Sequence, residues 1–466
     1  MPPAERLKPL TSPPQSESVL GAEANAAARS AAGNRATAPD AHANGPAPAA
    51  GTTVPAGNAA QTSQWSLLIG LSIVFFTLLA LYCAVLSVLL PNQIETIDRA
   101  NKASDLALVF AITSVFSTLT TPIAGALSDR TRTRWGRRTP WIVAGSIGGA
   151  VCLAAVSQMT ELWAITVFWV GATITLNCMQ AALTTVVADR FPPHERGKVS
   201  GFVGGGMTAG GTVGIVLAGH LAWNITLAYL VFASAIAVAC VGFVVVNPEP
   251  PVTAARPGRF DLGGFLKSFW VNPRQHPDFA WAFFGRFTIY MGYQGIVTYL
   301  LYILQDYIRL SIDQSNKMIA SLSTVTFFAL VISGFGSGLL SDAINRRKPL
   351  VFAAGLLMTA AMTVPLVTAS LGAMYAYAVL IGVGYGAFMS VDMALMTQVL
   401  PKSDGESTGK DLGILTTAVN IPQILSPVLA AWLLSTFHND YRALFISAIA
   451  FVFCGTFLVL PIRSVR

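Results

Sequence analysis

Twelve long apolar runs dominate this sequence, and they constrain its fold more than any other feature. Each run holds about 20 residues or more, the length that an α-helix needs to cross the hydrocarbon core of a bilayer. Only 11% of the residues are charged, against about 25% in an average soluble domain. We therefore expect an all-α polytopic membrane protein with twelve transmembrane helices. The expected helices span residues 65–90, 104–127, 140–158, 162–187, 199–222, 225–247, 279–304, 317–340, 349–370, 374–398, 411–434 and 442–461.

The segments between the runs divide the chain into parts. Residues 1–64 contain 18 Ala and 9 Pro without any hydrophobic periodicity, a composition typical of a disordered tail. Six runs form an expected N-terminal bundle, residues 65–247, and six form a C-terminal bundle, residues 279–461. We interpret residues 248–278 as a linker with a short amphipathic helix on the membrane surface, and residues 462–466 as a short end.

The distribution of Lys and Arg predicts how the chain is oriented. With the runs placed in the membrane, 23 of these residues fall on the side of the two termini, 5 fall on the opposite side, and Arg286 lies inside a run. Because positive loops stay in the cytoplasm, both termini are expected there, in a multi-pass protein of the cell (inner) membrane. This loop charge also accounts for the net charge of +7, so we expect no nucleic-acid partner.

The two groups of six runs are related by an internal repeat. Asp129 and Asp342 are 213 residues apart, as are Gln93 and Asp306, and a third pair of positions in corresponding loops is 212 apart. Two units in the same orientation imply a pseudo-two-fold axis along the membrane normal, with a cavity between them near the midplane. Such an architecture lets one half rock against the other, as carriers do.

The loop after the second run reads GALSDRTRTRWGRRTPWI, residues 125–142. It resembles the loop signature of the major facilitator superfamily. Its longer form, with a second basic cluster and a Pro-aromatic pair, is similar to that of the glycoside-pentoside-hexuronide cation symporters and the sucrose transporters. The resemblance implies a carrier that works by alternating access.

The same resemblance implies that charged residues of this loop and of its repeat hold the two halves together in an outward-open state. The implied gating residues are Asp129, Arg130, Arg134, Arg137, Arg138, Asp342, Arg346 and Arg347. In the alternative interpretation, the arginines only set orientation. The likeness to the melibiose-type symporters stops at Ser117 and Thr121, where those proteins carry cation-binding carboxylates. Sodium coupling at that place is therefore doubtful.

Two ionisable residues lie clearly inside the runs, Arg286 in the seventh and Asp392 in the tenth. A charge at the centre of a spanning helix costs about 2.5–3.5 kcal/mol on insertion scales, so each suggests a function. Both are about 10 Å from the cytoplasmic boundary at 1.5 Å per residue. We expect them to form an ion pair that proton or substrate binding breaks. The alternative is a permanent pair that only neutralises two charges.

Polar and aromatic side chains at helical spacing suggest a binding surface for a small polar solute. Amides and a guanidinium hydrogen-bond hydroxyl groups, while aromatic rings pack against the apolar face of a sugar. A single amide more often bridges helices than contacts a solute, so the prediction of a binding surface rests on their clustering. The candidate substrate-binding residues are Asn177, Gln180, Arg286, Tyr290, Tyr293, Gln294, Tyr385, Asn420 and Gln423.

Other functional classes lack support in the sequence. There is no phosphate-binding loop, and the five histidines and five cysteines form no catalytic or metal-binding pattern. We therefore expect no enzyme activity and no cofactor or metal. The prediction is a monomeric secondary transporter that moves a sugar or glycoside, with protons as the coupling ion. The alternatives are an efflux carrier for amphiphilic compounds and a non-transporting membrane receptor or scaffold.

Overall fold

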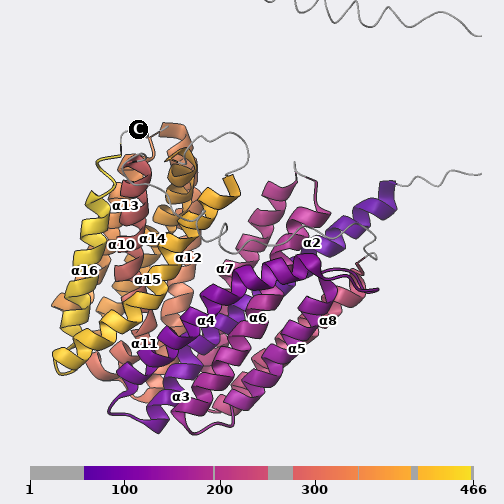
Figure 1. Ribbon diagram of the computed structural model, residues 1–466. Coiled ribbons are helices and arrows are strands. Elements are labelled where there is room, and N and C mark those ends of the chain that lie inside the picture. The colour runs from indigo at the N-terminus through magenta and orange to yellow at the C-terminus, as the bar shows by residue number, and fades with distance from the viewer. Residues whose placement is uncertain (1–56, 193–194, 250–276, 345, 400–407, 463–466) are drawn as a thin grey trace, which may run out of the picture. The chain divides into compact units, whose positions relative to one another are not determined.

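The computed structural model describes residues 57–192, 195–249, 277–344, 346–399 and 408–462, and these residues are almost entirely helical (Figure 1). Within these ranges the single β-type contact is an isolated bridge between Thr133 and Gly136. The expected tail and the expected amphipathic helix of the linker fall on residues 1–56 and 250–276, which lie outside the described ranges.

The first half, indigo to magenta in Figure 1, contains six helical rods. The first rod is continued through a π-helical segment, η1, close to Pro91. Pro91 has no N–H, so the regular α-helical ladder is interrupted there. The bounds are α2 (Gly57–Ala84) with η1 (Val85–Leu89) and α3 (Leu90–Ile97), α4 (Lys102–Arg130), α5 (Thr139–Val156), α6 (Leu162–Arg190), α7 (Arg196–Leu221) and α8 (Ile225–Val246).

The second half, orange to yellow, repeats this order, and its first rod bends by 51° after Thr298. The bounds are α10 (Pro277–Thr298) with α11 (Leu300–Tyr302) and η2 (Ile303–Tyr307), α12 (Ile312–Ile344), α13 (Lys348–Val367), α14 (Leu371–Val399), α15 (Thr408–Thr436) and α16 (Tyr441–Phe457).

The predicted all-α, twelve-helix architecture is confirmed. Ten of the described helices are long and apolar enough to cross a membrane, and the bent pair of α10 with α11 and η2 raises this to eleven. The twelfth rod, α16, is apolar but has 17 residues. Exposed apolar side chains follow single helix faces. On α12 they include Phe328, Ile332, Phe335 and Leu339, spaced so that one face meets lipid.

Helix pairing repeats between the halves, as the sequence repeat predicts. In the first half α2 packs against α7 and α8, and in the second half α10 packs against α15 and α16. The pairs α4 with α6 and α5 with α6 recur as α12 with α14 and α13 with α14. The halves themselves meet through α7 with α12 and α4 with α15. This pairing is what a pseudo-two-fold relation between two six-helix units requires.

Glycines on α7 let its backbone approach α2 closely. A Cβ added at Gly210 or Gly214 would collide with the carbonyl oxygens of Phe76 and Ala80. Small residues serve this role in membrane helices because contact between backbones replaces the missing hydrophobic driving force. Close packing against α2 therefore explains the glycines at positions 210 and 214.

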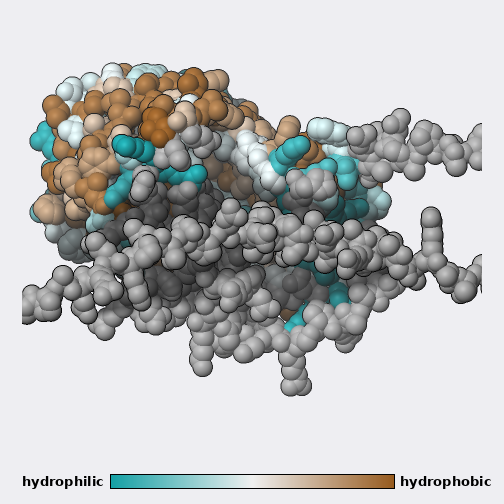
Figure 2. Space-filling view, turned by 90° about the horizontal axis from the view of Figure 1, so that it is seen from above, coloured by the Kyte–Doolittle hydropathy of each residue, from teal (hydrophilic) through white to brown (hydrophobic). Residues whose placement is uncertain are grey.

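The surroundings of α7 differ between its two ends. Gly219 meets the backbone of Asn316 on α12. Gly201 lies 18 residues earlier, five helical turns and about 27 Å away on the same face, yet no atom of the described residues lies within 4 Å of a Cβ added there. We call the Gly219 end, which carries α3 and α11 in Figure 1, the closed end. We call the opposite end, where no described atom lies within 4 Å of a Cβ added at Gly201, the open end. Figure 2 views the molecule from above, with brown apolar residues on the visible flank and teal hydrophilic residues in small patches.

Candidate functional site

Arg286 of α10 and Asp392 of α14 form a buried ion pair inside the second half. The guanidinium Nη1 lies 3.3 Å from Asp392 Oδ2, and the two side chains are 7% and 5% exposed. The two helices run in opposite directions, so residues at similar depth meet. Removing both charges from water is costly, and the mutual attraction compensates for that cost only when the geometry is good.

The geometry of this pair is incomplete. Asp392 Oδ2 and Arg286 Nε are both buried without a hydrogen-bond partner among the described residues, so the 3.3 Å contact is an electrostatic approach without hydrogen-bond alignment. A buried charge that lacks its full set of partners is rare in proteins and calls for an explanation.

Three tyrosines lie directly above the pair and contact one another. The Tyr293 and Tyr385 rings are stacked, with centroids 4.2 Å apart and planes within 9°. The Tyr385 hydroxyl donates to that of Tyr290 over 3.4 Å, and the Arg286 guanidinium faces the Tyr290 ring, 5.8 Å from its centre. The structure therefore brings four predicted binding residues together with Asp392. Tyr290 is 4% exposed, so mutual packing takes up much of its surface.

The remaining predicted amides of the second half are less constrained. Gln294 donates to Thr298 along its own helix, over 3.3 Å. Asn420 and Gln423 are exposed on α15, which packs against both α10 and α4. Exposed amides on a helix that contacts both halves can interact with a solute between them.

In the first half, Asn177 connects three helices. Its Oδ1 accepts a hydrogen bond from Tyr82 of α2 over 3.3 Å, and its Nδ2 donates to Ser117 of α4 over 2.7 Å. Asn177 is buried, 7% exposed, so it holds helices together in this conformation. Gln180, one turn further along α6, is half-buried.

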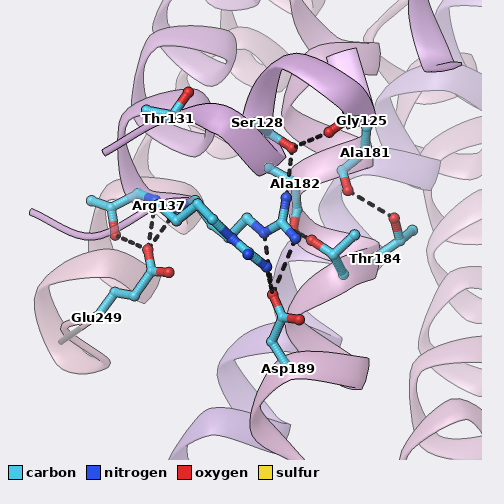
Figure 3. A network of polar contacts seen from close by, with 12 residues as sticks. Gly125, Ser128, Thr131, Arg137, Ala181, Ala182, Thr184, Asp189 and Glu249 are labelled. Atoms are coloured by element: carbon cyan, nitrogen blue, oxygen red, sulfur yellow. Dashed lines mark hydrogen bonds and ion pairs between the residues drawn. The ribbon is translucent and has the colours of Figure 1, made fainter. Parts of the chain in front are cut away.

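The predicted gating arginines Arg137 and Arg138 contact the first half itself (Figure 3). Both donate to Asp189 Oδ2 at the end of α6, over 2.9 Å from Arg137 and 3.2 Å from Arg138. Arg138 also donates to Ser128 over 2.6 Å and is 3% exposed. These bonds fix the α4–α5 loop onto the end of α6.

A carboxylate from the end of the first half caps α5. Glu249 Oε2 accepts from the backbone N–H groups of Arg138 and Thr139, over 2.7 and 3.1 Å, and Figure 3 shows it approaching the start of this helix. An anion at a helix N-terminus is stabilised by the free N–H groups and the helix dipole. The α4–α5 loop thereby connects the ends of α4, α6 and the segment after α8.

The structure describes the side chains of only some of the other predicted gating residues. The side chains of Asp129 and Asp342 lie outside the described atoms. Arg134 lies over the Trp135 ring at 5.4 Å, and Arg130 is exposed. Arg346 is exposed and Arg347 is half-buried at the N-cap of α13.

Two buried charged residues were missed by the sequence analysis, which identified only Arg286 and Asp392 inside the helices. Glu95 of α3 and Lys102 of α4 are 5% and 6% exposed, and Lys102 donates to Glu95 over 3.0 Å. The sequence places both near the ends of their apolar runs, where charges ordinarily reach water. Among the described residues, no cluster of three His, Cys, Asp or Glu side chains could hold a metal ion.

Comparison with known sequences identifies the family of transporters that this chain resembles. The sequence model of the Major Facilitator Superfamily matches residues 68–403 and, in a second match, residues 283–466. An uncharacterized symporter of Synechocystis sp. is 31% identical over 109 residues, which is 20% of each chain. This match therefore spans about a fifth of that relative's length.

Two fungal proteins match over most of the chain. An MFS-type transporter of Aspergillus fumigatus is 22% identical over 347 residues, covering 69% of this chain and 74% of the relative. The fujikurins efflux protein of Gibberella fujikuroi is 24% identical over 361 residues, covering 73% and 70%.

Solved structures share the fold. A bacterial homologue of the human lysosomal transporter Spinster, in an inward-facing and unoccupied conformation, aligns with a TM-score of 0.67 at 14% identity, covering 86% of this chain and 98% of that one. A D-xylose-proton symporter aligns with a TM-score of 0.62 at 15% identity, covering 86% and 98%. At such identities, the likeness concerns the fold alone.

Proposed function

This chain belongs to the Major Facilitator Superfamily of membrane transporters, and we propose that it is a secondary active transporter that takes up a sugar or glycoside together with a proton. The family moves small solutes across membranes and its members are not enzymes. The solute, the coupling ion and the direction are our proposal. A place in the glycoside and sucrose branch is part of that proposal and rests on the GALSDRTRTRWGRRTPWI loop.

The observation that carries the proposal is the buried, incompletely bonded pair of Arg286 and Asp392. Asp392 can accept a proton and thereby lose its charge, and Arg286 then loses its counter-ion. The freed guanidinium can hydrogen-bond solute hydroxyls, and the tyrosines above it offer ring faces for a pyranose.

Proton and solute binding would be linked through this single pair. A protonated Asp392 frees Arg286 for the solute, and solute bound at Arg286 disfavours re-forming the ion pair. Each ligand then favours the binding of the other, because coupling between two sites is reciprocal. An inward proton gradient would drive uptake of the solute.

The proposed orientation places the open end in the cytoplasm. The positive loops, and therefore both termini, lie at this end, and the closed end faces outward. The conformation would then be inward-open, in a monomer in the cell (inner) membrane. The halves 65–247 and 279–461 would rock about the closed end, with residues 248–278 as the cytoplasmic linker.

We propose that the arginine-rich loops close this cytoplasmic end when the transporter opens outward. Arg137 and Arg138 are held in place by Asp189, which fixes the α4–α5 loop for contact with its repeat in the second half. The proposed gating set includes Asp129, Arg130, Arg134, Asp342, Arg346 and Arg347.

Transport by the purified protein in proteoliposomes tests the function. We expect accumulation of one or more labelled sugars or glycosides when the lumen is alkaline, and none without the gradient. Asp392→Asn is expected to abolish gradient-driven uptake while solute exchange remains measurable. Asp313→Asn serves as the control because that carboxylate is 71% exposed and paired on the surface of α12. Unchanged gradient-driven uptake by Asp392→Asn would exclude the coupling role.

A second candidate function is efflux of an amphiphilic compound, and the similarity to the fujikurins efflux protein favours it. The same proteoliposomes distinguish the two functions. An exporter would move a lipophilic cation in exchange for protons, and it would not accumulate sugars under the alkaline-lumen gradient.

A further inference from the structure

The closed end contains a buried cation shared between the two halves. Lys102 Nζ donates to Glu95 of its own half over 3.0 Å, and to Gln305 and Asp306 of the other half over 3.1 and 3.0 Å. The ammonium also lies 4.6 Å from the centre of the Tyr302 ring. We call Glu95, Lys102, Gln305 and Asp306 the Lys102 cluster. All three donors of the ammonium are used, so the cation is fully bonded although it is buried.

At the Lys102 cluster, contact between the two halves depends on the positive charge of Lys102. Glu95 and Asp306 both lie about 3.0 Å from the same nitrogen, although they belong to opposite halves. Without the ammonium, two carboxylates would face each other across the interface, with Glu95 only 4% exposed. Like charges in a partly buried site repel strongly because water screens them poorly. The other cation near Glu95 is Arg99, at 3.8 Å and 78% exposed, where it contributes little.

Neutral hydrogen bonds surround the cluster and join the same two halves. Asn92 donates to Asn316 over 2.8 Å, with both side chains buried. The hydroxyl of Tyr302 donates to the Pro91 carbonyl over 3.0 Å, and that of Tyr299 to the Ala103 carbonyl over 2.9 Å. All of these bonds lie at the closed end, so opening that end must break them together with the bonds of Lys102.

Asp306 is held in position by its own half. Tyr441 at the start of α16 donates to Asp306 Oδ2 over 2.8 Å, while Oδ1 receives the bond from Lys102. The carboxylate is therefore fixed on the second half, and Lys102 is fixed on the first half through Glu95. Rocking of one half against the other separates Lys102 from Asp306 and leaves Lys102 paired with Glu95.

We propose that Lys102 is a gating residue that keeps the closed end shut and thereby makes the present conformation the resting state of the transporter. This role rests on the proposed alternating-access function. Lys102 joins two carboxylates from opposite halves, and loss of its charge turns attraction into repulsion at the closed end. The equilibrium then shifts toward the state in which that end is open.

The test measures conformation without any solute. Spin labels at Thr160→Cys and Ala369→Cys report the distance between the two halves, because both residues are exposed in short loops of the closed end. Labelling of Gly201→Cys, in a separate variant, reports access at the open end. Both reporters are placed in a background without the five native cysteines, in the full chain reconstituted in lipid.

Lys102→Met is expected to lengthen the Thr160–Ala369 distance and to slow labelling at position 201. Lys317→Met is the matched control, because Lys317 lies near the same end but pairs with Asp313 within α12, with both side chains mostly exposed. The charge swap Lys102→Asp with Asp306→Lys keeps one cation among two carboxylates and is expected to restore the parent distance. Should Lys102→Met fold poorly, Lys102→Asp with and without Asp306→Lys provides the same comparison.

An unchanged distance in Lys102→Met, an equal change in Lys317→Met, or no recovery in the charge swap would each overturn the proposal. Flux assays separate this result from the proposed function. A shifted distance without any sugar flux would support the role of Lys102 and exclude the proposed substrate. Sugar flux without a shifted distance would support the proposed substrate and exclude the role of Lys102.

Discussion

At the residue scale, the Arg286–Asp392 pair combines burial with incomplete hydrogen bonding. Its two charges are buried, yet Asp392 Oδ2 and Arg286 Nε find no hydrogen-bond partner within the described part of the chain. A pair kept only for stability would gain from completing these bonds, and apolar residues of similar volume are often at least as stable as a buried pair. Its persistence in this form fits a contact that opens during the transport cycle.

Removing one charge of this pair should lower the free energy of unfolding far more than removing both charges. Arg286→Leu leaves the Asp392 charge buried and unpaired, so we expect a loss of about 3–5 kcal/mol in the free energy of unfolding. The double variant Arg286→Leu with Asp392→Leu should recover most of that loss. Thermal unfolding of the detergent-purified variants measures this, and a double variant as unstable as the single one would contradict it.

Gly136 is a second position where a single residue is constrained. Its φ of +100° is one that residues with a side chain rarely adopt, and a Cβ there would collide with Glu249. Gly136→Ala should therefore destabilise the protein by about 1–3 kcal/mol and disturb the cap of α5. Gly242→Ala is the control, because nothing lies within 4 Å of a Cβ added there. Thermal unfolding of both variants checks this, and equal melting temperatures would refute the expected strain.

At the element scale, α7 offers a matched test of helix packing. Gly210→Ala introduces a Cβ that collides with the carbonyl of Phe76 on α2, and overpacking of this kind costs about 1–3 kcal/mol. Gly201→Ala, on the same helix, meets nothing within 4 Å and should be neutral or stabilising, because Ala favours helices over Gly by up to about 1 kcal/mol. Measured in the same detergent, the melting temperature of Gly210→Ala should therefore fall, and that of Gly201→Ala should stay unchanged or rise.

The twelve helices could be predicted from the sequence because the bilayer fixes their length and polarity. Their ends were less predictable. The first helix continues to Ile97, past the predicted end at residue 90, because Asn92 and Gln93 find buried hydrogen-bond partners there. The bend after Thr298 has no proline to signal it. Local patterns do not contain the tertiary contacts that extend or bend a helix.

The residues of the candidate site, like the helices, could be predicted only in part from the sequence. Arg286 and Asp392 stood out because a charge inside an apolar run is costly, and antiparallel helices bring equal depths together. Lys102 did not stand out, since at the end of an apolar run it is indistinguishable from a loop lysine that sets orientation. Its burial arises from Gln305 and Asp306, more than 200 residues away. Only the contact between the two halves reveals it.

At the scale of the whole molecule, the halves touch at the closed end, whereas no described atom lies against the same face of α7 at Gly201. Gly219 contacts Asn316, whereas Gly201 is open. Alternating access requires that these contacts break while new ones form at the open end. The closed end is therefore a place where a covalent link should stop the cycle without touching the solute site.

Cysteines at Asn92 and Asn316 provide that link. Their side chains contact across the halves at 2.8 Å, so a short bifunctional thiol reagent can bridge Asn92→Cys and Asn316→Cys in a background without the native cysteines. We expect bridging to abolish net flux in proteoliposomes, and a reductant that cleaves the bridge to restore it, because rocking must separate these residues. Each single-cysteine variant, treated in the same way, controls for modification alone. Flux that persists in the fully bridged protein would show that the halves do not separate at this end, and alternating access by rocking about it would have to be abandoned.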